Sequence, residues 1–303
     1  MKQTSIYRLI LPVVVLLLGA SCSDWTETEN IDNTVLKPWE QDPALWADYT
    51  AALRSYKASE HYLSYARLHN SPSPAASEQD FMRCLPDSLD IVTLTNADNF
   101  SAYDAEDMAA MHEKGTKVLY QVDYAARKAE FSGEATLKTY LDGVIAAVAA
   151  NGLDGYSFTT DPLDAAATAT IVATLSAARS DGQLLVFEGN PLSVAEADRA
   201  KLDFVVLDTE KAENTTEVLL QVLNATGYAG IAPEKLLLAA EIDAPLQDAD
   251  RTEYAAVALM ARCVVEYGPL AGFAAYNIAG DYYHAEMNYQ TIRTAIQTLN
   301  PSK

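Results

Sequence analysis

The chain has 303 residues, of which 50% are hydrophobic and 21% are charged, and its formal net charge at pH 7 is −21. This composition excludes a disordered tail protein and a small disulfide-stabilised domain. The acidic charge repels phosphate backbones, so the sequence also argues against a nucleic-acid partner.

The first residues are typical of a targeting segment. Lys2 and Arg8 precede an apolar run from Leu9 to Leu18, and small residues then lead to Cys22. This order predicts a signal peptide over residues 1–21. It resembles a bacterial lipoprotein signal, which implies that Cys22 is lipidated. An ordinary secretory signal, with Cys22 incidental, is the alternative.

A polar, acidic stretch follows Cys22 and predicts a tether over residues 22–40. It resembles the surface-export signal of glycan-utilising Gram-negative bacteria. The two resemblances imply a lipid-anchored protein of the outer membrane that faces the cell surface. The remaining cysteines, Cys84 and Cys263, have no metal-binding spacing, so we expect no metal site, and no motif predicts a cofactor.

Strand-like apolar runs alternate with helix-like segments from residue 41 to residue 303. The expected strands are residues 61–68, 89–96, 116–123, 153–160, 184–188, 202–208, 235–242 and 272–278. Eight βα units of this kind predict an α/β fold, a single-domain TIM (β/α)8 barrel. A doubly wound sheet is the alternative, but the first strand lacks a glycine-rich phosphate loop.

Capping residues mark several of the expected helices. Asp42 is expected to cap a helix that begins at Pro43, and Asp104 to cap a helix that continues through Glu106. Asn151-Gly152 is expected to end the helix before the fourth strand. Ser193 and Glu196 form a capping-box pattern, and a last helix is expected over residues 287–299.

The fourth strand carries a recognisable motif. Residues 152–161 are Gly-Leu-Asp-Gly-Tyr-Ser-Phe-Thr-Thr-Asp. This segment resembles the Asp-Gly-x-Asp-x-Asp-x-Glu motif of glycoside hydrolase family 18, the chitinases and endo-β-N-acetylglucosaminidases. The last strand, residues 271–278, also resembles the endo-acting branch.

The resemblance assigns roles to positions of this strand. Asp154 and Gly155 match the family, but Ser157 and Thr159 stand where it has aspartates, and Asp161 stands at its general acid. The family's mechanism uses the substrate's own acetamido group. It needs a glutamic acid that reaches the glycosidic oxygen and an aspartate that supports the acetamido group. Asp161 is one methylene shorter, and Asp161-Pro162 is also typical of a helix start.

Strand ends line the mouth of a TIM barrel, and sugars are bound there by aromatic faces and aimed polar groups. The expected sugar contacts are Tyr156, Ser157, Thr159, Asp123, Tyr124, Glu188, Asp208, Glu241, Tyr276 and Asn277.

These observations predict a surface lipoprotein whose catalytic site is impaired. It would bind an N-acetylglucosamine-containing glycan, similar to an N-glycan, for an outer-membrane importer. Two alternatives remain open. One is an active endo-β-N-acetylglucosaminidase that uses Asp161 as its acid. The other is an assembly lipoprotein that binds no sugar.

Overall fold

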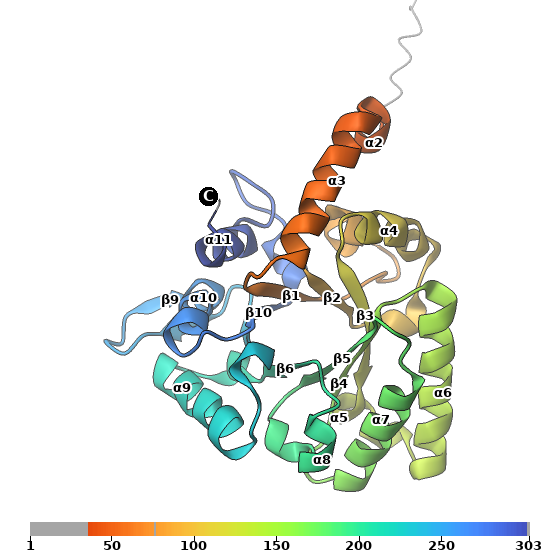
Figure 1. The fold of residues 1–303 in the computed structure, drawn as a ribbon, viewed down its shortest axis with the longest axis vertical. Helices are drawn as coiled ribbons and strands as arrows, with labels where there is room; N and C mark the ends of the chain where they lie inside the picture. Colours follow the sequence, from red (N-terminus) through yellow and green to blue (C-terminus); the bar gives the residue numbers. More distant parts are fainter. Residues whose placement is uncertain (1–35, 76, 302–303) are drawn as a thin grey trace, which may run out of the picture. The chain divides into compact units, whose positions relative to one another are not determined.

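The structure is a computed structural model that describes residues 36–75 and 77–301 (Figure 1). The predicted signal peptide, Cys22 and most of the predicted tether lie outside the described residues. The chain divides into two units, residues 1–46 and 47–303. The first unit contains the short helix α2 (Pro38–Gln41), and helix α3 (Pro43–Ala58) begins in it. Asp42 caps α3 as expected, because its Oδ1 accepts from the Leu45 N–H at 3.0 Å.

The second unit contains a closed barrel of eight parallel strands, which confirms the TIM-barrel prediction. Around the barrel the order is β1-β10-β7-β6-β5-β4-β3-β2. The strands are β1 (Leu63–Leu68), β2 (Ile91–Leu94), β3 (Lys117–Asp123), β4 (Gly155–Thr159), β5 (Leu184–Glu188), β6 (Phe204–Leu207), β7 (Leu236–Glu241) and β10 (Gly272–Tyr276). A small antiparallel hairpin, β8 (Pro245–Gln247) and β9 (Glu253–Ala255), follows β7.

Helices surround the strands (Figure 1). They are α4 (Ala102–Glu113), α5 (Tyr124–Arg127), α6 (Glu134–Asn151), α7 (Ala165–Ala178), α8 (Glu196–Arg199), α9 (Thr215–Leu223), α10 (Ala256–Glu266) and α11 (Gln290–Leu299). Short 3-10 turns occupy Glu78–Asp80, Met82–Cys84, Ala97–Asn99, Lys128–Glu130, Pro191–Ser193, Thr209–Lys211, Pro233–Lys235 and Ile278–Asp281, and a π turn occupies Asn224–Tyr228. Within the described residues, no helix is long and apolar enough to cross a membrane.

Two of the expected caps are wrong and one helix end is right. Ser101, not Asp104, caps α4, and Asp104 is the third helical residue of a capping box. Ser193 lies in a 3-10 turn, and α8 begins after Ala195 without a side-chain cap. Gly152 ends α6 in the left-handed conformation, at φ 67°, as expected.

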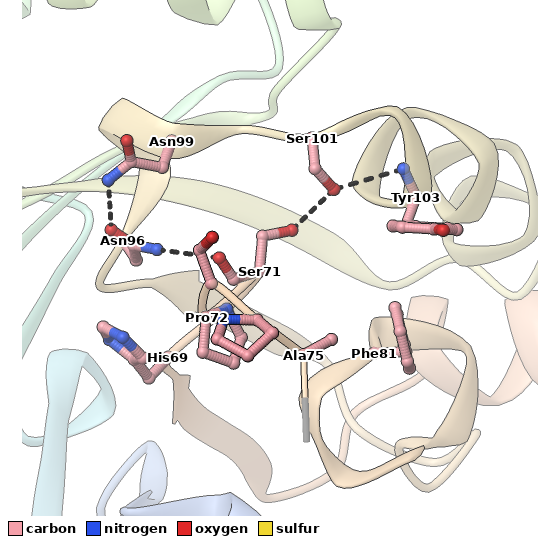
Figure 2. A pocket seen from close by; sticks show the side chains of 11 residues that line it. His69, Ser71, Pro72, Ala75, Phe81, Asn96, Asn99, Ser101 and Tyr103 are labelled. Carbon is pink, nitrogen blue, oxygen red and sulfur yellow. Dashed lines mark hydrogen bonds between the residues drawn. The ribbon is translucent and has the colours of Figure 1, made fainter. Parts of the chain in front are cut away.

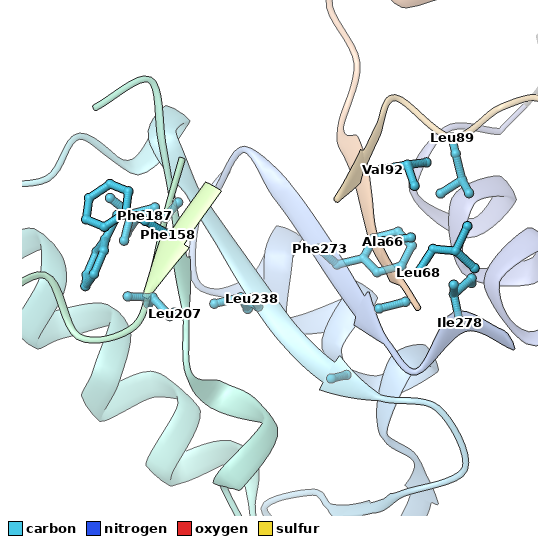
Figure 3. Close-up of a cluster of buried hydrophobic side chains, with 14 of the residues drawn as sticks. Ala66, Leu68, Leu89, Val92, Phe158, Phe187, Leu207, Leu238, Phe273 and Ile278 are labelled. Carbon is cyan, nitrogen blue, oxygen red and sulfur yellow. The ribbon is translucent and has the colours of Figure 1, made fainter. Parts of the chain in front are cut away.

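Alternation along the strands creates two apolar layers. Inward side chains, such as Leu119, Val186 and Leu237, fill the barrel lumen. Outward side chains pack against the helices in a larger cluster, part of which Figure 3 shows around Phe158 and Phe187. Because aliphatic side chains fill the lumen along the strands, the polar side chains of the lumen gather near the C-terminal strand ends.

Two glycines allow the strands to approach at their first residues. A Cβ at Gly155 would lie 2.1 Å from the Leu184 carbonyl oxygen, and its φ is +133°. A Cβ at Gly272 would lie 1.9 Å from the Leu63 carbonyl oxygen. Neither position accepts a side chain without movement of the neighbouring strand.

Candidate functional site

The centre of the barrel mouth is built around Glu188, the last residue of β5. Its side chain is completely buried. Such a carboxylate must be paired and hydrogen-bonded to be stable in the lumen. It accepts hydrogen bonds from Tyr65 Oη (2.8 Å), Arg67 Nε (2.5 Å), Gln121 Nε2 (3.2 Å) and Tyr276 Oη (3.3 Å).

The strand register explains why these side chains meet. Tyr65 and Tyr276 belong to the inward layer, together with Val186, which is two residues before Glu188. Side chains two apart on a strand share a face, so Arg67 and Glu188 also face the lumen. Residues from β1, β3, β5 and β10 therefore converge at one level of the barrel.

Arg67 neutralises this centre. Its guanidinium forms an ion pair with Glu188 and lies 3.5 Å from the centre of the Tyr276 ring. The nearby carboxylate and phenols raise the pKa of Arg67, although burial opposes this. Burial and the charge of Glu188 raise the pKa of Tyr65 and Tyr276 well above the ordinary value. At neutral pH the centre of the mouth therefore contains the ion pair between Arg67 and Glu188, beside the neutral hydroxyls of Tyr65 and Tyr276.

The fourth strand contributes hydroxyls to the mouth and no carboxylate. Ser157 is completely buried, and its hydroxyl accepts from Thr93 Oγ1 at 3.2 Å. Thr159 donates to Asp123 Oδ1 at 2.6 Å and accepts from the Ala125 N–H. The structure thus places Ser157, Thr159 and Asp123 at the mouth.

Asp161 lies in the turn beyond β4 and is already bound. Lys128 Nζ donates to its Oδ2 at 2.7 Å, and the Leu163 N–H donates to its Oδ1 at 2.9 Å. Both bonds favour the charged form and lower its pKa. Asp161 does not cap the next helix, because Asp164 does so by accepting from the Ala167 N–H. In this geometry Asp161 does not serve as a proton donor for hydrolysis.

Two of the predicted sugar contacts point away from the mouth. Tyr156 is an outward residue of β4, buried in the cluster between strands and helices. Tyr124 lies in α5, where its hydroxyl donates to Asp164 at 2.6 Å and its ring stacks on Phe131. These two predictions are therefore wrong: tyrosine in an apolar run does not reveal which face of the strand it occupies.

The remaining predicted contacts lie on the rim. Glu241 pairs in register with Tyr276, so it faces the same lumen. Asn277 is exposed and has φ 56°. Asp208 is partly exposed and lies 3.5 Å from Lys211 Nζ.

The sequence analysis missed several polar residues of the mouth. Tyr65, Thr93 and Gln121 are inward members of their strands and were not selected. Each lies two residues from another inward position on its strand, and this spacing could have identified it as facing the lumen. Glu210 also lies near the mouth: within the described residues its Oε2 is buried without a hydrogen-bond partner, and burial raises its pKa.

Other reactive groups do not form a site. Cys84 and Cys263 are both free thiols. Over residues 36–75 and 77–301, no group of three or more His, Cys, Asp or Glu side chains could hold a metal ion.

Comparison with known proteins confirms the resemblance inferred from β4. Residues 26–144 match the model of glycoside hydrolase family 18, BT1044-like. The match ends before β4, so it is independent of the motif there. No curated protein sequence matches the chain.

Several solved structures share the fold. A selenomethionine form of BT1044 with a Glu-to-Gln substitution has a TM-score of 0.67 and 17% identity, over 88% of this chain and 94% of that chain. Endo-β-N-acetylglucosaminidase from Cordyceps militaris has a TM-score of 0.64 and 16% identity, over 84% and 96%. A doubly substituted form of that fungal enzyme, in complex with fucosyl-N-acetylglucosamine-Asn, has a TM-score of 0.60 and 16% identity, over 83% and 95%.

Proposed function

We propose that the barrel mouth binds an N-acetylglucosamine-containing oligosaccharide, similar to an N-glycan, without hydrolysing it. One observation carries this proposal. The β4 positions that the family motif gives to acids hold Ser157, Thr159 and Asp161, and the single acid among them is bound to Lys128.

Each replacement removes a requirement of the substrate-assisted mechanism. Thr159 has no charge to stabilise the positive intermediate that forms from the acetamido group. Asp161 has a lowered pKa, so it stays ionised where a protonated acid is needed. Glu188 cannot take over either role while it accepts from four residues.

The mouth keeps groups that suit sugar recognition. The Arg67 guanidinium and the rim side chains Glu241 and Asn277 provide polar groups, while the Tyr276 ring is buried and covered by that guanidinium. Polar side chains of this kind can orient a bound sugar through hydrogen bonds. The complex of the fungal enzyme with fucosyl-N-acetylglucosamine-Asn supports the choice of ligand class.

The proposal includes a location. The segment around Cys22 supports a lipid anchor in the outer membrane, facing the cell surface, where the protein would present glycans to an importer. In a Gram-negative host, labelled palmitate should be incorporated into the wild type and into Cys84→Ala, but not into Cys22→Ala. Equal labelling of all three chains would contradict the anchor.

Native mass spectrometry tests binding and hydrolysis in one experiment. The chain from Ser23 to Lys303 is mixed with released glycans that contain a di-N-acetylchitobiose core. We expect protein–glycan complexes and no shortened glycans, and we expect the same result for Asp161→Asn.

Two outcomes would overturn the proposal. Shortened glycans that disappear with Asp161→Asn would make the protein an active glycosidase with Asp161 as its acid. The absence of both complexes and products would remove the sugar-binding function and favour a role in assembly.

A further inference from the structure

A pocket opens beside the mouth, beyond the ends of β1 and β2 (Figure 2). Its volume is about 730 Å³, and ligand sites commonly have about 300–1,000 Å³. Its walls come from the loop after β1, the turn after β2 and the start of α4. Its position next to the strand ends makes it a candidate extension of the sugar-binding mouth.

The pocket carries no formal charge, although the chain has a net charge of −21. None of its lining residues is Asp, Glu, Lys or Arg. Asp104, which contacts its wall, is buried and accepts from Asn70, Ser71 and Ser101. The Arg83 guanidinium, 5.6 Å from the centre of the Phe81 ring, is neutralised by ion pairs with Glu106 and Asp107. The pocket therefore offers neutral hydrogen-bonding groups, and the charge of the whole protein disfavours an anionic ligand.

Aromatic rings form one side of the pocket. Phe81 and Tyr103 meet edge to face, with ring centroids 5.4 Å apart. Tyr103 lies in the first turn of α4 and is 57% exposed. Its hydroxyl has no hydrogen-bond partner among residues 36–75 and 77–301. An exposed aromatic face beside neutral polar groups is suited to the apolar face of a sugar ring.

The opposite side presents polar atoms on a fixed support. The Asn96 amide donates to the Asn70 and Ser71 carbonyls at 2.8 and 3.3 Å, and it accepts from Asn99 Nδ2 at 2.7 Å. Within the described residues, Asn99 Oδ1 keeps its accepting capacity. His69 contacts Thr95 through Nδ1 at 3.3 Å, which leaves Nε2 available. Figure 2 shows His69 and Tyr103 on opposite sides of the view.

We infer that this pocket binds one uncharged pyranose residue of the oligosaccharide held at the mouth, stacked on Tyr103, and so favours neutral glycans over glycans that end in carboxylated sugars. The inference rests on the proposed function. It gives that function a specificity: His69, which lines the pocket, is two residues beyond Arg67 of the mouth.

Calorimetric titration with a matched pair of probes tests the inference. The probes are a biantennary N-glycan with two terminal sialic acids and the same glycan after their removal. We expect the wild type to bind the neutral glycan at least about threefold more tightly. Tyr103→Ser should weaken binding of the neutral glycan about tenfold, because it removes the stacking face.

Tyr228→Ser is the matched control, because Tyr228 is 79% exposed and lies in the turn after α9, away from the pocket. It should bind the neutral glycan as the wild type does. If the wild type and Tyr103→Ser bind the neutral glycan equally tightly, the assignment of a sugar to this pocket is overturned, but the proposed function is not. Equal affinity of the wild type for both probes would overturn the selectivity. No binding by the wild type would overturn the proposed function itself.

Discussion

The guanidinium of Arg67 lies 3.5 Å from the centre of the Tyr276 ring and binds the buried carboxylate of Glu188. A planar cation satisfies both neighbours at once, with its edge towards the carboxylate and its face towards the ring. This arrangement closes the lumen above its aliphatic layer.

The ion pair predicts a strong asymmetry between single and double substitutions. Arg67→Met leaves the Glu188 carboxylate buried without its cation, so the free energy of unfolding should fall by about 3–5 kcal/mol. Arg67→Met combined with Glu188→Leu removes both charges and should recover most of that loss. Urea unfolding at neutral pH measures all three proteins.

The exposed Lys138–Glu134 pair of α6 provides the control. Lys138→Met should leave the unfolding free energy nearly unchanged, because exposed pairs contribute little. A double variant as unstable as Arg67→Met would contradict the pairing argument.

Glu210 predicts that one substitution near the mouth is stabilising. Its carboxylate is mostly buried, its Oε2 has no hydrogen-bond partner in the part of the chain that the structure describes, and burial raises its pKa. Ionisation therefore costs free energy in the folded state once the pH exceeds the ordinary pKa of 4.5. Glu210→Gln should raise the free energy of unfolding at neutral pH by about 1 kcal/mol.

The gain from Glu210→Gln should shrink as the pH falls towards about 4, where the wild-type side chain is protonated. Glu213→Gln, at an exposed position nearby, should show no such trend. If the increase in the free energy of unfolding were the same at every pH, the ionisation of Glu210 would not be its cause.

The sequence predicted the barrel closely, because its strands are apolar runs bounded by polar turns. The run Leu184–Glu188 coincides with β5, and the other strands differ only at their ends. The same analysis selected Glu188 and Tyr276, because each ends a strand. The strand-end argument therefore reached the centre of the mouth, including its buried carboxylate.

Side-chain direction and long-range pairing were harder to predict. Tyr156 belongs to the outward face, which only the polar neighbours Ser157 and Thr159 indicate. Asp161 is held by Lys128 from a different βα loop, and no local pattern announces that pair. Arg67 and Glu188 are 121 residues apart, so their contact follows from barrel closure and not from sequence spacing.

His61 predicts a pH-dependent contribution to stability on the opposite face of the barrel. Its Nε2 lies 2.9 Å from Asp90 Oδ1 and its Nδ1 lies 2.8 Å from the Ser59 carbonyl oxygen. Two acceptors favour the doubly protonated ring, and the hydrogen bond to Asp90 is the main cause of its raised pKa; burial and Lys57 oppose it.

A raised pKa in the fold means that the stabilisation is fully present below the unfolded value of 6.5 and is lost as the pH rises through the folded value. The difference in unfolding free energy between the wild type and His61→Gln should therefore shrink as the pH rises above the unfolded value of 6.5. His69→Gln is the control, because the exposed His69 contacts Thr95 and, among the described residues, no carboxylate. A constant difference for His61→Gln would contradict the proposed protonation.

Replacing glycine by alanine should have opposite effects at the strand starts and within helix α6. Gly155→Ala and Gly272→Ala would each place a methyl group about 2 Å from a carbonyl oxygen of the adjacent strand. Since that oxygen belongs to the barrel's hydrogen-bonded backbone, strand pairing must open to relieve the overlap.

Gly143→Ala, by contrast, adds a methyl group in open space within α6 and should raise the free energy of unfolding by about 1 kcal/mol. Circular dichroism with thermal unfolding should show loss of the cooperative transition for the first two variants and a higher Tm for the third. A cooperative wild-type transition in Gly155→Ala would mean that the β4–β5 register tolerates a side chain, and the close approach would then not be what requires glycine there.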